Sequence, residues 1–371
     1  MTSQVAIMNL YGVAIASDSL ASRRAEDGFI TTDGNKKIWS IGPEHKVVAL
    51  HYGSTVIGSM PHQIHFEAWA RTLTKPLPNV PAYVKSYQAY CASSKSIHGR
   101  KTEDDISFTI FHDALTRLRN NLTADPEAEP EKFHQTATEF KAFYTKAKKF
   151  AGTSDEWLEE TIKKQKIDLN KLINNYFEFK FAAKTRTAIK QGMKQFYLAA
   201  LGIKSDTNLM FVGFGAKDDF AGAQRLFMRG ITNGKLLSFT DEPVYVSPDG
   251  IDSRILYAAQ FDAMKMFVQG IHPQMFDTLS TIAHNVLQEH LPEDTQPDKV
   301  HEISSKIVEG LQQHSDEQYV QPAFNAILNM NTDQLAASAR GLVLLQTAAA
   351  SIGTSSPTVG GQVEVVTLQK A

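Results

Sequence analysis

The first 55 residues alternate between short apolar runs and polar turn sequences. Such runs are typical of β-strands, and here they cover residues 5–7, 13–16, 29–32, 37–41 and 46–51. Tyr11-Gly12 is a turn sequence between the first two runs, and this spacing predicts a short antiparallel hairpin that is buried on at least one face. A second hairpin is predicted around Asp33-Gly34-Asn35, between the third and fourth runs.

Apolar residues three or four positions apart dominate two later parts of the chain and predict helices. The predicted helices cover residues 53–73, 141–150, 156–179, 182–201, 251–271, 275–289, 298–313 and 327–353. Strand patterns return between these parts and at the end, over residues 208–215, 226–231, 235–239, 243–248 and 361–368. Asn233-Gly234 separates two of these strands and is a strong hairpin signal.

The order of strands, helices, strands, helices and a last strand predicts an α+β fold in which helical layers cover antiparallel sheets. We expect residues 1–371 to form a single domain, with a large helical insertion over 75–205 and an additional helical region over 275–350. Strands and helices do not alternate one by one, and no glycine-rich phosphate-binding motif is present. Nucleotide binding is therefore a weak interpretation.

Composition narrows the classes of protein. The 38 basic and 40 acidic residues give a net charge of -2, which argues against a dedicated nucleic-acid-binding protein. Cys91 is the single cysteine, so an intrachain disulfide and a cysteine-rich metal site are excluded and a reducing compartment is favoured. The N-terminus lacks the pattern of a secretory signal, and the apolar run 341–353 contains Gln346 and is too short to span a membrane. We therefore expect a cytoplasmic protein without a membrane partner.

Four features of the first 54 residues carry the candidate chemistry. Thr2 follows the initiator methionine, and Asp18 ends the second apolar run. Lys36-Lys37 opens a later strand, and Gly53-Ser54 lies where the next strand gives way to a predicted helix. Each feature alone has an ordinary structural explanation, such as a turn-capping aspartate, a surface lysine or a glycine that permits a tight turn.

Together these features match the chemistry of an N-terminal threonine. Its hydroxyl attacks an amide carbonyl while the free α-amine accepts the proton. The reference pKa of an α-amine is about 7.7–8.0, so a useful neutral fraction exists near neutral pH. A lysine ammonium nearby disfavours protonation of the amine, and an aspartate can hold that lysine charged and oriented. A backbone N–H at a strand end can stabilise the oxyanion.

The same residues carry a resemblance to a known family. The runs that carry it are Thr2-Ser-Gln-Val-Ala-Ile, Gly12-Val-Ala-Ile-Ala-Ser-Asp18-Ser, Asn35-Lys-Lys-Ile-Trp-Ser-Ile and Val47-Val-Ala-Leu-His-Tyr-Gly53-Ser54. They resemble the start of a proteasome β-type subunit, and these subunits are N-terminal-nucleophile (Ntn) hydrolases. The resemblance covers the first 55 residues well and continues more weakly at 209–215 and 360–365.

The resemblance implies a four-layer αββα sandwich of antiparallel sheets and a set of site residues. Thr2, exposed by removal of Met1, is the nucleophile and supplies the base through its amine. Asp18 orients Lys37, the catalytic lysine, and the Gly53 N–H stabilises the oxyanion. The reaction passes through an acyl-enzyme ester and needs no metal or organic cofactor. Proteasome-type subunits form rings, so a homo-oligomer is expected, with an ATPase partner left open.

The chain departs from the family pattern at several positions. Leu20 stands where the family has an arginine two residues after the strand-ending aspartate. The family also has a serine and an aspartate–serine pair that support the amine. This chain lacks these residues at the corresponding positions. The positions that align with them are Gln260 or Asp262 for the serine, and Ser356 with Thr358 or Val359 for the pair.

His51 and Ser54 are the candidate substrate-binding residues. His51 lies on a strand that borders the expected pocket, and a histidine there can titrate near neutral pH; packing away from the site is the alternative. His62 and His65 are spaced i, i+3 on a predicted helix without a third metal ligand nearby. Cys91 fits a packed thiol.

The expected function is that of a proteasome-like threonine peptidase acting on peptide bonds. Two alternatives stay open: an Ntn amidase acting on a small amide, and a non-catalytic proteasome-like scaffold. A lid formed by the helical insertion over Thr2 would favour the small-amide alternative, because it would make a small closed pocket. Four aromatic residues of the insertion are expected either to pack in a core or to line such a lid, namely Phe177, Phe181, Phe196 and Tyr197.

Overall fold

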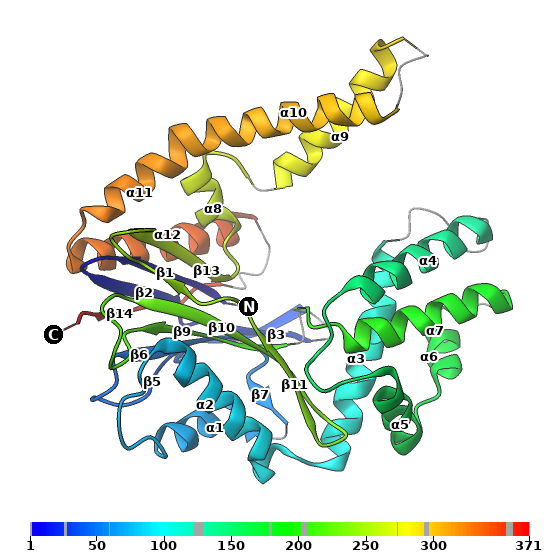
Figure 1. Cartoon of the computed structure of the whole chain (residues 1–371), viewed down its shortest axis with the longest axis horizontal. Coiled ribbons are helices and arrows are strands. Elements are labelled where there is room, and N and C mark those ends of the chain that lie inside the picture. Colours follow the sequence, from blue (N-terminus) through cyan, green and yellow to red (C-terminus); the bar gives the residue numbers. More distant parts are fainter. Residues whose placement is uncertain are drawn as a thin grey trace.

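The strands of the protein form antiparallel sheets and its helices lie beside them, so the predicted α+β class is confirmed (Figure 1). The computed structural model describes residues 2–25, 28–58, 60–121, 129–177, 180–201, 206–272, 274–292, 297–353 and 359–370. Two larger sheets form the centre of the molecule, and two small hairpins lie at their margins.

The first sheet joins strands from both ends of the chain. Its order is β13 (Ser253–Ala259), β1 (Ser3–Asn9), β2 (Gly12–Asp18) and β14 (Val363–Leu368). The strands β1 and β2 form the predicted N-terminal hairpin, in which Asn9 pairs with Gly12 beside the turn. The start of the chain is therefore held between strands that lie far away in the sequence.

The second sheet comes from the middle of the chain. Its order is β11 (Lys235–Thr240), β10 (Gly222–Thr232), β9 (Thr207–Gly213), β6 (Val47–Gly53) and β5 (Ile38–Ser40), with β12 (Val244–Tyr245) also paired to β10. The predicted hairpin at Asn233-Gly234 is confirmed, because β10 and β11 flank it. Both turn residues have positive φ, as a two-residue hairpin turn of this type requires.

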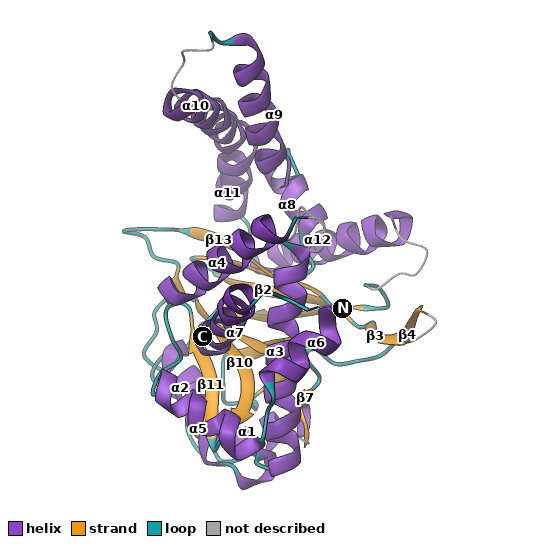
Figure 2. Ribbon diagram, turned by 90° about the vertical axis from the view of Figure 1, so that its right-hand side faces the viewer, coloured by secondary structure: helices purple, strands orange, loops and turns teal. Residues whose placement is uncertain are grey.

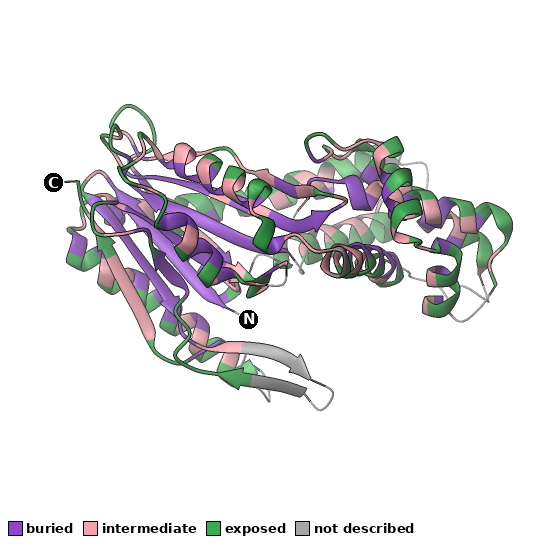
Figure 3. Ribbon diagram, turned by 90° about the horizontal axis from the view of Figure 1, so that it is seen from below, coloured by how far each residue is buried: buried purple, intermediate pink, exposed green. Residues whose placement is uncertain are grey.

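Alternate side chains of the strands form two faces, as the period of two in an extended chain dictates. The inner faces of the two sheets pack on one another through Ala6, Met8, Val13 and Ile15 on one side and Val48, Leu50, Met210 and Val212 on the other. Figure 3 shows these central strands as almost wholly buried. The interface between the sheets is therefore a continuous apolar core.

Helices cover the outer faces of both sheets. The helices α8 (Asp262–Gln269), α11 (Gln321–Leu328) and α12 (Thr332–Gly353) pack on the first sheet, where Leu335 and Val343 contact the β1–β2 side chains. The helices α1 (His62–Ala70) and α2 (Val80–Ser93) pack on the second sheet through Phe66, Trp69 and Tyr87. The layers thus follow one another as helices, sheet, sheet and helices (Figure 1).

The helix α12 is longer than the apolar run 341–353 from which a membrane span was excluded. It has 22 residues, and by length and composition it is the one described helix that could cross a membrane. In this structure Leu335, Ala339, Leu342 and Val343 are buried against β1 and β2. This packing is that of a helix that covers a sheet.

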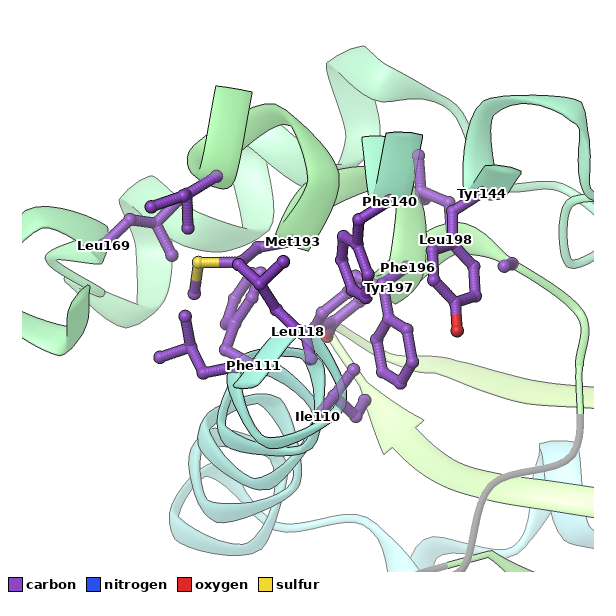
Figure 4. Packing of buried hydrophobic residues seen from close by; sticks show 14 of the residues in the cluster. Ile110, Phe111, Leu118, Phe140, Tyr144, Leu169, Met193, Phe196, Tyr197 and Leu198 are labelled. Carbon is purple, nitrogen blue, oxygen red and sulfur yellow. The ribbon is translucent and has the colours of Figure 1, made fainter. Parts of the chain in front are cut away.

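A group of five helices has a hydrophobic core of its own beside the second sheet. They are α3 (Arg100–Asn120), α4 (Pro130–Lys146), α5 (Asp155–Gln165), α6 (Leu169–Phe177) and α7 (Ala183–Leu198). Phe111, Phe140, Met193 and Phe196 meet in this core (Figure 4). We call these five helices the helical body. Helix α2 precedes them and packs on the sheet instead.

Two further helices form an arm that projects beyond the helices that cover the first sheet (Figure 1). Helices α9 (Gln274–His290) and α10 (Pro297–Ser315) pack side by side and extend away from the sheets (Figures 1 and 2). A π-helical segment, η2 (Asp316–Val320), links α10 to α11. No described residue of α9 is buried. The arm therefore contributes little to the central core.

Several predicted elements were wrong in extent or type. Residues 251–271 form strand β13 and then helix α8, rather than one helix, because β13 pairs along its whole length with β1. The helix predicted from residue 53 begins at His62, and before it β7 (Val56–Ile57) pairs with β8 (Met60–Pro61). The helix predicted over 156–179 is divided at Lys166, which has a φ of +55°.

The predicted hairpin between 29–32 and 37–41 was also wrong. Strand β4 (Gly28–Thr32) pairs with β3 (Ala21–Ala25), and β5 pairs with β6. The intervening segment is held to the main body, because the Asn35 N–H donates to the Ser19 carbonyl oxygen at 3.0 Å. This arrangement places Lys37 at the start of a strand in the second sheet, beside the end of β2.

Candidate active site

Thr2 lies beside the start of β1, an inner strand of the first sheet, and lines a cavity. It directly precedes β1, is 9% exposed, and its carbonyl oxygen accepts a hydrogen bond from the Gln260 N–H at 2.9 Å. The cavity has a volume of about 1140 Å³ and is also lined by Lys37, His51 and Gly53. Residues from the first sheet and from two strands of the second therefore face one space.

Asp18 and Lys37 form a buried ion pair next to Thr2. The Lys37 ammonium donates to Asp18 Oδ1 at 2.7 Å and to the Leu20 carbonyl oxygen at 2.7 Å. Asp18 Oδ1 also accepts from the Ser3 N–H at 2.8 Å, and Oδ2 accepts from the Gly360 N–H at 3.1 Å. Because Ser3 follows Thr2 directly, this carboxylate fixes the lysine and the N-terminal backbone relative to one another.

Burial changes the acidity of this lysine. The pKa of Lys37 lies below its usual value because burial disfavours the ammonium form, and the Asp18 carboxylate offsets part of this effect. The neighbouring Lys36 is exposed, so only the second lysine of the pair occupies the buried position. Leu20 contributes through its backbone oxygen, so the missing arginine side chain leaves that contact to Lys37 intact.

Gly53 ends β6 in a conformation that excludes other residues. Its φ is +94°, and a Cβ added there would overlap the Asp206 carbonyl oxygen. The following Ser54 N–H donates to this same oxygen at 3.3 Å. The Ser54 hydroxyl donates to the Val56 carbonyl oxygen at 3.1 Å, so it is engaged within the turn. The strand end is thus fixed tightly at the wall of the cavity.

His51 is neutral and supports this turn. Burial lowers the pKa of His51 to about 4, and Lys37 adds to the effect against the hydrogen bond with Ser54. Its Nε2–H donates to the Ser54 carbonyl oxygen at 2.9 Å, and its ring stacks on Trp39 with 4.5 Å between centroids. The lowered pKa and the stacking on Trp39 favour a packed, neutral imidazole, and the residue borders the cavity as expected.

Gln4 is a buried side chain that sequence reasoning missed. Its amide Nε2 donates to the His51 carbonyl oxygen at 3.0 Å and to Ser17 Oγ at 3.2 Å. It thereby joins the hairpin of the first sheet to β6 of the second, directly behind the site. The available signal was an amide between Thr2 and an apolar run, which is unusual for a strand buried on both faces.

The positions that align with the family's amine-supporting residues are placed unequally. Gln260 lines the cavity next to Thr2, whereas Asp262 begins α8 and does not line it. Ser356 and Thr358 lie outside the described residues. Val359 is fully buried and precedes the glycine whose N–H binds Asp18.

The first helix of the helical body forms a wall of the same cavity. Thr102, Asp105, Ile106, Thr109 and Ile110 of α3 line it. Their spacing places them on one face of the helix. The four aromatic residues of the possible lid pack in or against the core of the helical body. Phe196 and Tyr197 are seen there in Figure 4.

His62, His65 and Cys91 are part of a buried polar cluster under the second sheet. The Tyr87 hydroxyl lies 2.8 Å from His62 Nε2 and 3.1 Å from His65 Nδ1. Burial raises the pKa of Cys91 to about 12, as expected of an unreactive packed thiol. Within the described ranges, no group of three or more His, Cys, Asp or Glu side chains is arranged to hold a metal ion.

Comparisons with protein-family models and with curated proteins found no match to this chain.

Proposed function

We propose that this protein is an Ntn hydrolase of the proteasome-like threonine peptidase type, with Thr2 as its nucleophile once Met1 has been removed. The observation that carries the proposal is the Asp18 carboxylate, which binds both the Lys37 ammonium and the Ser3 N–H. The succession of helices, sheet, sheet and helices supports an Ntn-type αββα sandwich. A cytoplasmic location and a homo-oligomer belong to the same proposal.

In the first half of the reaction, the Thr2 hydroxyl oxygen attacks the amide carbonyl carbon and its proton passes to the Thr2 α-amine. The Lys37 ammonium disfavours a second charge on that amine and favours negative charge on the hydroxyl oxygen. The Gly53 N–H stabilises the oxyanion of the tetrahedral intermediate. The α-ammonium then protonates the leaving amine, and an ester on Thr2 results.

In the second half, water attacks the ester carbonyl. The α-amine accepts a proton from the water, the carboxylic acid leaves, and the proton returns to the Thr2 oxygen. The buried pair of Asp18 and Lys37 stays charged throughout and holds the geometry. These steps need only groups of this chain and water.

The size of the cavity favours a peptide over a small amide. Its volume of about 1140 Å³ exceeds the upper end of the range common for small-molecule sites, roughly 300–1,000 Å³. An extended peptide can lie between the strand ends and α3. A scaffold without activity would not need the buried lysine, whose desolvation is costly.

Substitution of the nucleophile tests the proposal. We expect Thr2→Ala to lower peptide hydrolysis at least about 10³-fold, because the hydroxyl is the attacking group. Thr55→Ala is the matched control, since Thr55 also lines the cavity and is exposed. It should keep activity within about threefold. Equal activity of Thr2→Ala and wild type, with both proteins folded, would contradict the proposal.

A further inference from the structure

The wall that α3 presents to the cavity is anchored. The Ser107 hydroxyl lies 2.7 Å from Thr232 Oγ1 on β10 and 2.8 Å from the Tyr197 hydroxyl on α7, and all three residues are buried. The preceding residue, Ile106, packs over Gly230, where an added Cβ would come within 2.7 Å of the Ile106 Cδ1. These contacts fix which face of α3 meets the cavity.

Asp105 is the one carboxylate among the described residues that line the cavity. It is exposed, and it has no salt-bridge partner within the described parts of the chain. The methyl-bearing side chains of Thr102, Ile106 and Thr109 lie on the same face of the helix. The wall therefore offers one negative charge flanked by the side chains of two threonines and an isoleucine.

Unlike Asp105, the positively charged side chains that line the cavity either form ion pairs or lie away from α3. Lys37 is held by Asp18, and Arg229 is paired with Asp206 at 3.4 Å and donates to the Leu201 carbonyl oxygen. Lys36 is exposed and belongs to the segment before β5, not to α3. The face of α3 is thus the negative side of the cavity.

We propose that Asp105 selects substrates that carry a cationic group on an alkyl stem, as lysine and arginine side chains do. The stem would pack on the threonine and isoleucine side chains, and the cation would bind the carboxylate. This inference rests on the proposed function, because it assigns a substrate class to the same cavity. It makes Asp105 a specificity-determining residue on an element that the family resemblance does not cover.

Matched peptides test the preference. A single arginine is moved along a neutral fluorogenic peptide, and each peptide is compared with one that has citrulline at that position, which keeps the shape and removes the charge. We expect wild-type kcat/KM to favour arginine at one position. Asp105→Asn should lower the ratio of kcat/KM for the arginine peptide to kcat/KM for the citrulline peptide about threefold to tenfold. Asp105→Lys should make the citrulline peptide the better substrate.

Glu160→Gln is the control, because this exposed glutamate of α5 lies outside the cavity and its loss changes the net charge equally. It should leave the ratio unchanged. An Asp105→Asn enzyme that hydrolyses the peptides with the wild-type ratio overturns the inference and leaves the proposed function in place.

A binding measurement separates the two proposals. The affinity of the arginine and citrulline peptides is measured by calorimetry on Thr2→Ala, with and without Asp105→Asn. Tighter binding of the arginine peptide that disappears in the double variant supports the role of Asp105 even if the wild type proves inactive. Equal affinity for both peptides, or no binding of either, overturns it.

Discussion

Lys37 illustrates how a single residue combines stability with chemistry. Its ammonium is almost fully buried, and it donates to Asp18 Oδ1 and to the Leu20 carbonyl oxygen, each at 2.7 Å. Removing one member of such a pair leaves an uncompensated buried charge, which typically costs about 3–5 kcal/mol. Substitution of Lys37 therefore reports on folding as well as on catalysis, and pH is the gentler probe.

The pKa of Lys37 predicts an alkaline limit to activity. Because burial lowers this pKa below 10.5, the folded protein loses the Lys37 proton at a lower pH than the unfolded chain does. We predict that kcat/KM falls as the pH rises through this pKa, at a pH below 10.5. The free energy of unfolding increases as the pH rises over the same interval, because the unfolded chain binds one proton more than the folded protein.

The measurement is a pH–rate profile together with circular dichroism. Loss of activity with the fold retained is the expected outcome. Activity that stays constant up to pH 10.5 would show that a charged Lys37 is not needed.

At the residue scale, the side chains of the candidate site could be identified from the sequence, but its backbone groups could not. Thr2, Lys37 and Gly53 do line one cavity, and Asp18 binds the Lys37 ammonium and the Ser3 N–H. The Leu20 oxygen and the Gly360 N–H, which complete the ion pair, carry no residue-type signal because every residue has such groups. Gln4 was missed because a long polar side chain in a strand is usually expected to be exposed to solvent.

The strand β6 ends at Gly53, whose N–H is the proposed oxyanion donor. Gly53 and Gly34 both have positive φ, but only Gly53 is surrounded by backbone. At Gly34 an added Cβ would have nothing within 4 Å. Substitution of Gly34 therefore measures the cost of the positive φ alone, whereas substitution of Gly53 adds the cost of steric overlap.

We predict that Gly34→Ala lowers the free energy of unfolding by about 1–2 kcal/mol, which is the cost of a left-handed alanine. Gly53→Ala should cost at least about 3 kcal/mol, because the Asp206 carbonyl must also move. It should also reduce kcat, whereas Gly34→Ala should not. Urea denaturation and kinetics of both variants provide the measurement, and equal destabilisation would contradict the steric explanation.

At the element scale, local patterns identified hairpins that close within a few residues and missed pairings between distant segments. The hairpins at Tyr11-Gly12 and Asn233-Gly234 were correct because turn and strands are adjacent in the sequence. Strand β13 was read as the start of a helix, since a seven-residue apolar segment fits either period. Its partner β1 lies about 250 residues earlier, so pairing with β1 decided its conformation.

At the scale of the whole molecule, the cavity depends on segments from distant parts of the chain. The hairpin β1–β2 supplies Thr2 and Asp18, the second sheet supplies Lys37 and Gly53, and the helical body supplies the facing wall. The arm of α9 and α10 lies away from the central sheets (Figure 2). The sequence resemblance to a proteasome β-type subunit is mainly in the segments that bear Thr2, Asp18, Lys37 and Gly53, and the α3 wall has no counterpart in it.

Whether Thr2 is a nucleophile with a free α-amine can be measured as the intact mass of the protein after incubation with a peptide epoxyketone. This probe requires a threonine hydroxyl and a free α-amine on one residue. We expect a species that lacks Met1 and carries one probe molecule, and no such adduct on Thr2→Ala. Protein that lacks Met1 but stays unlabelled at saturating probe would contradict a peptide-accepting Thr2 nucleophile.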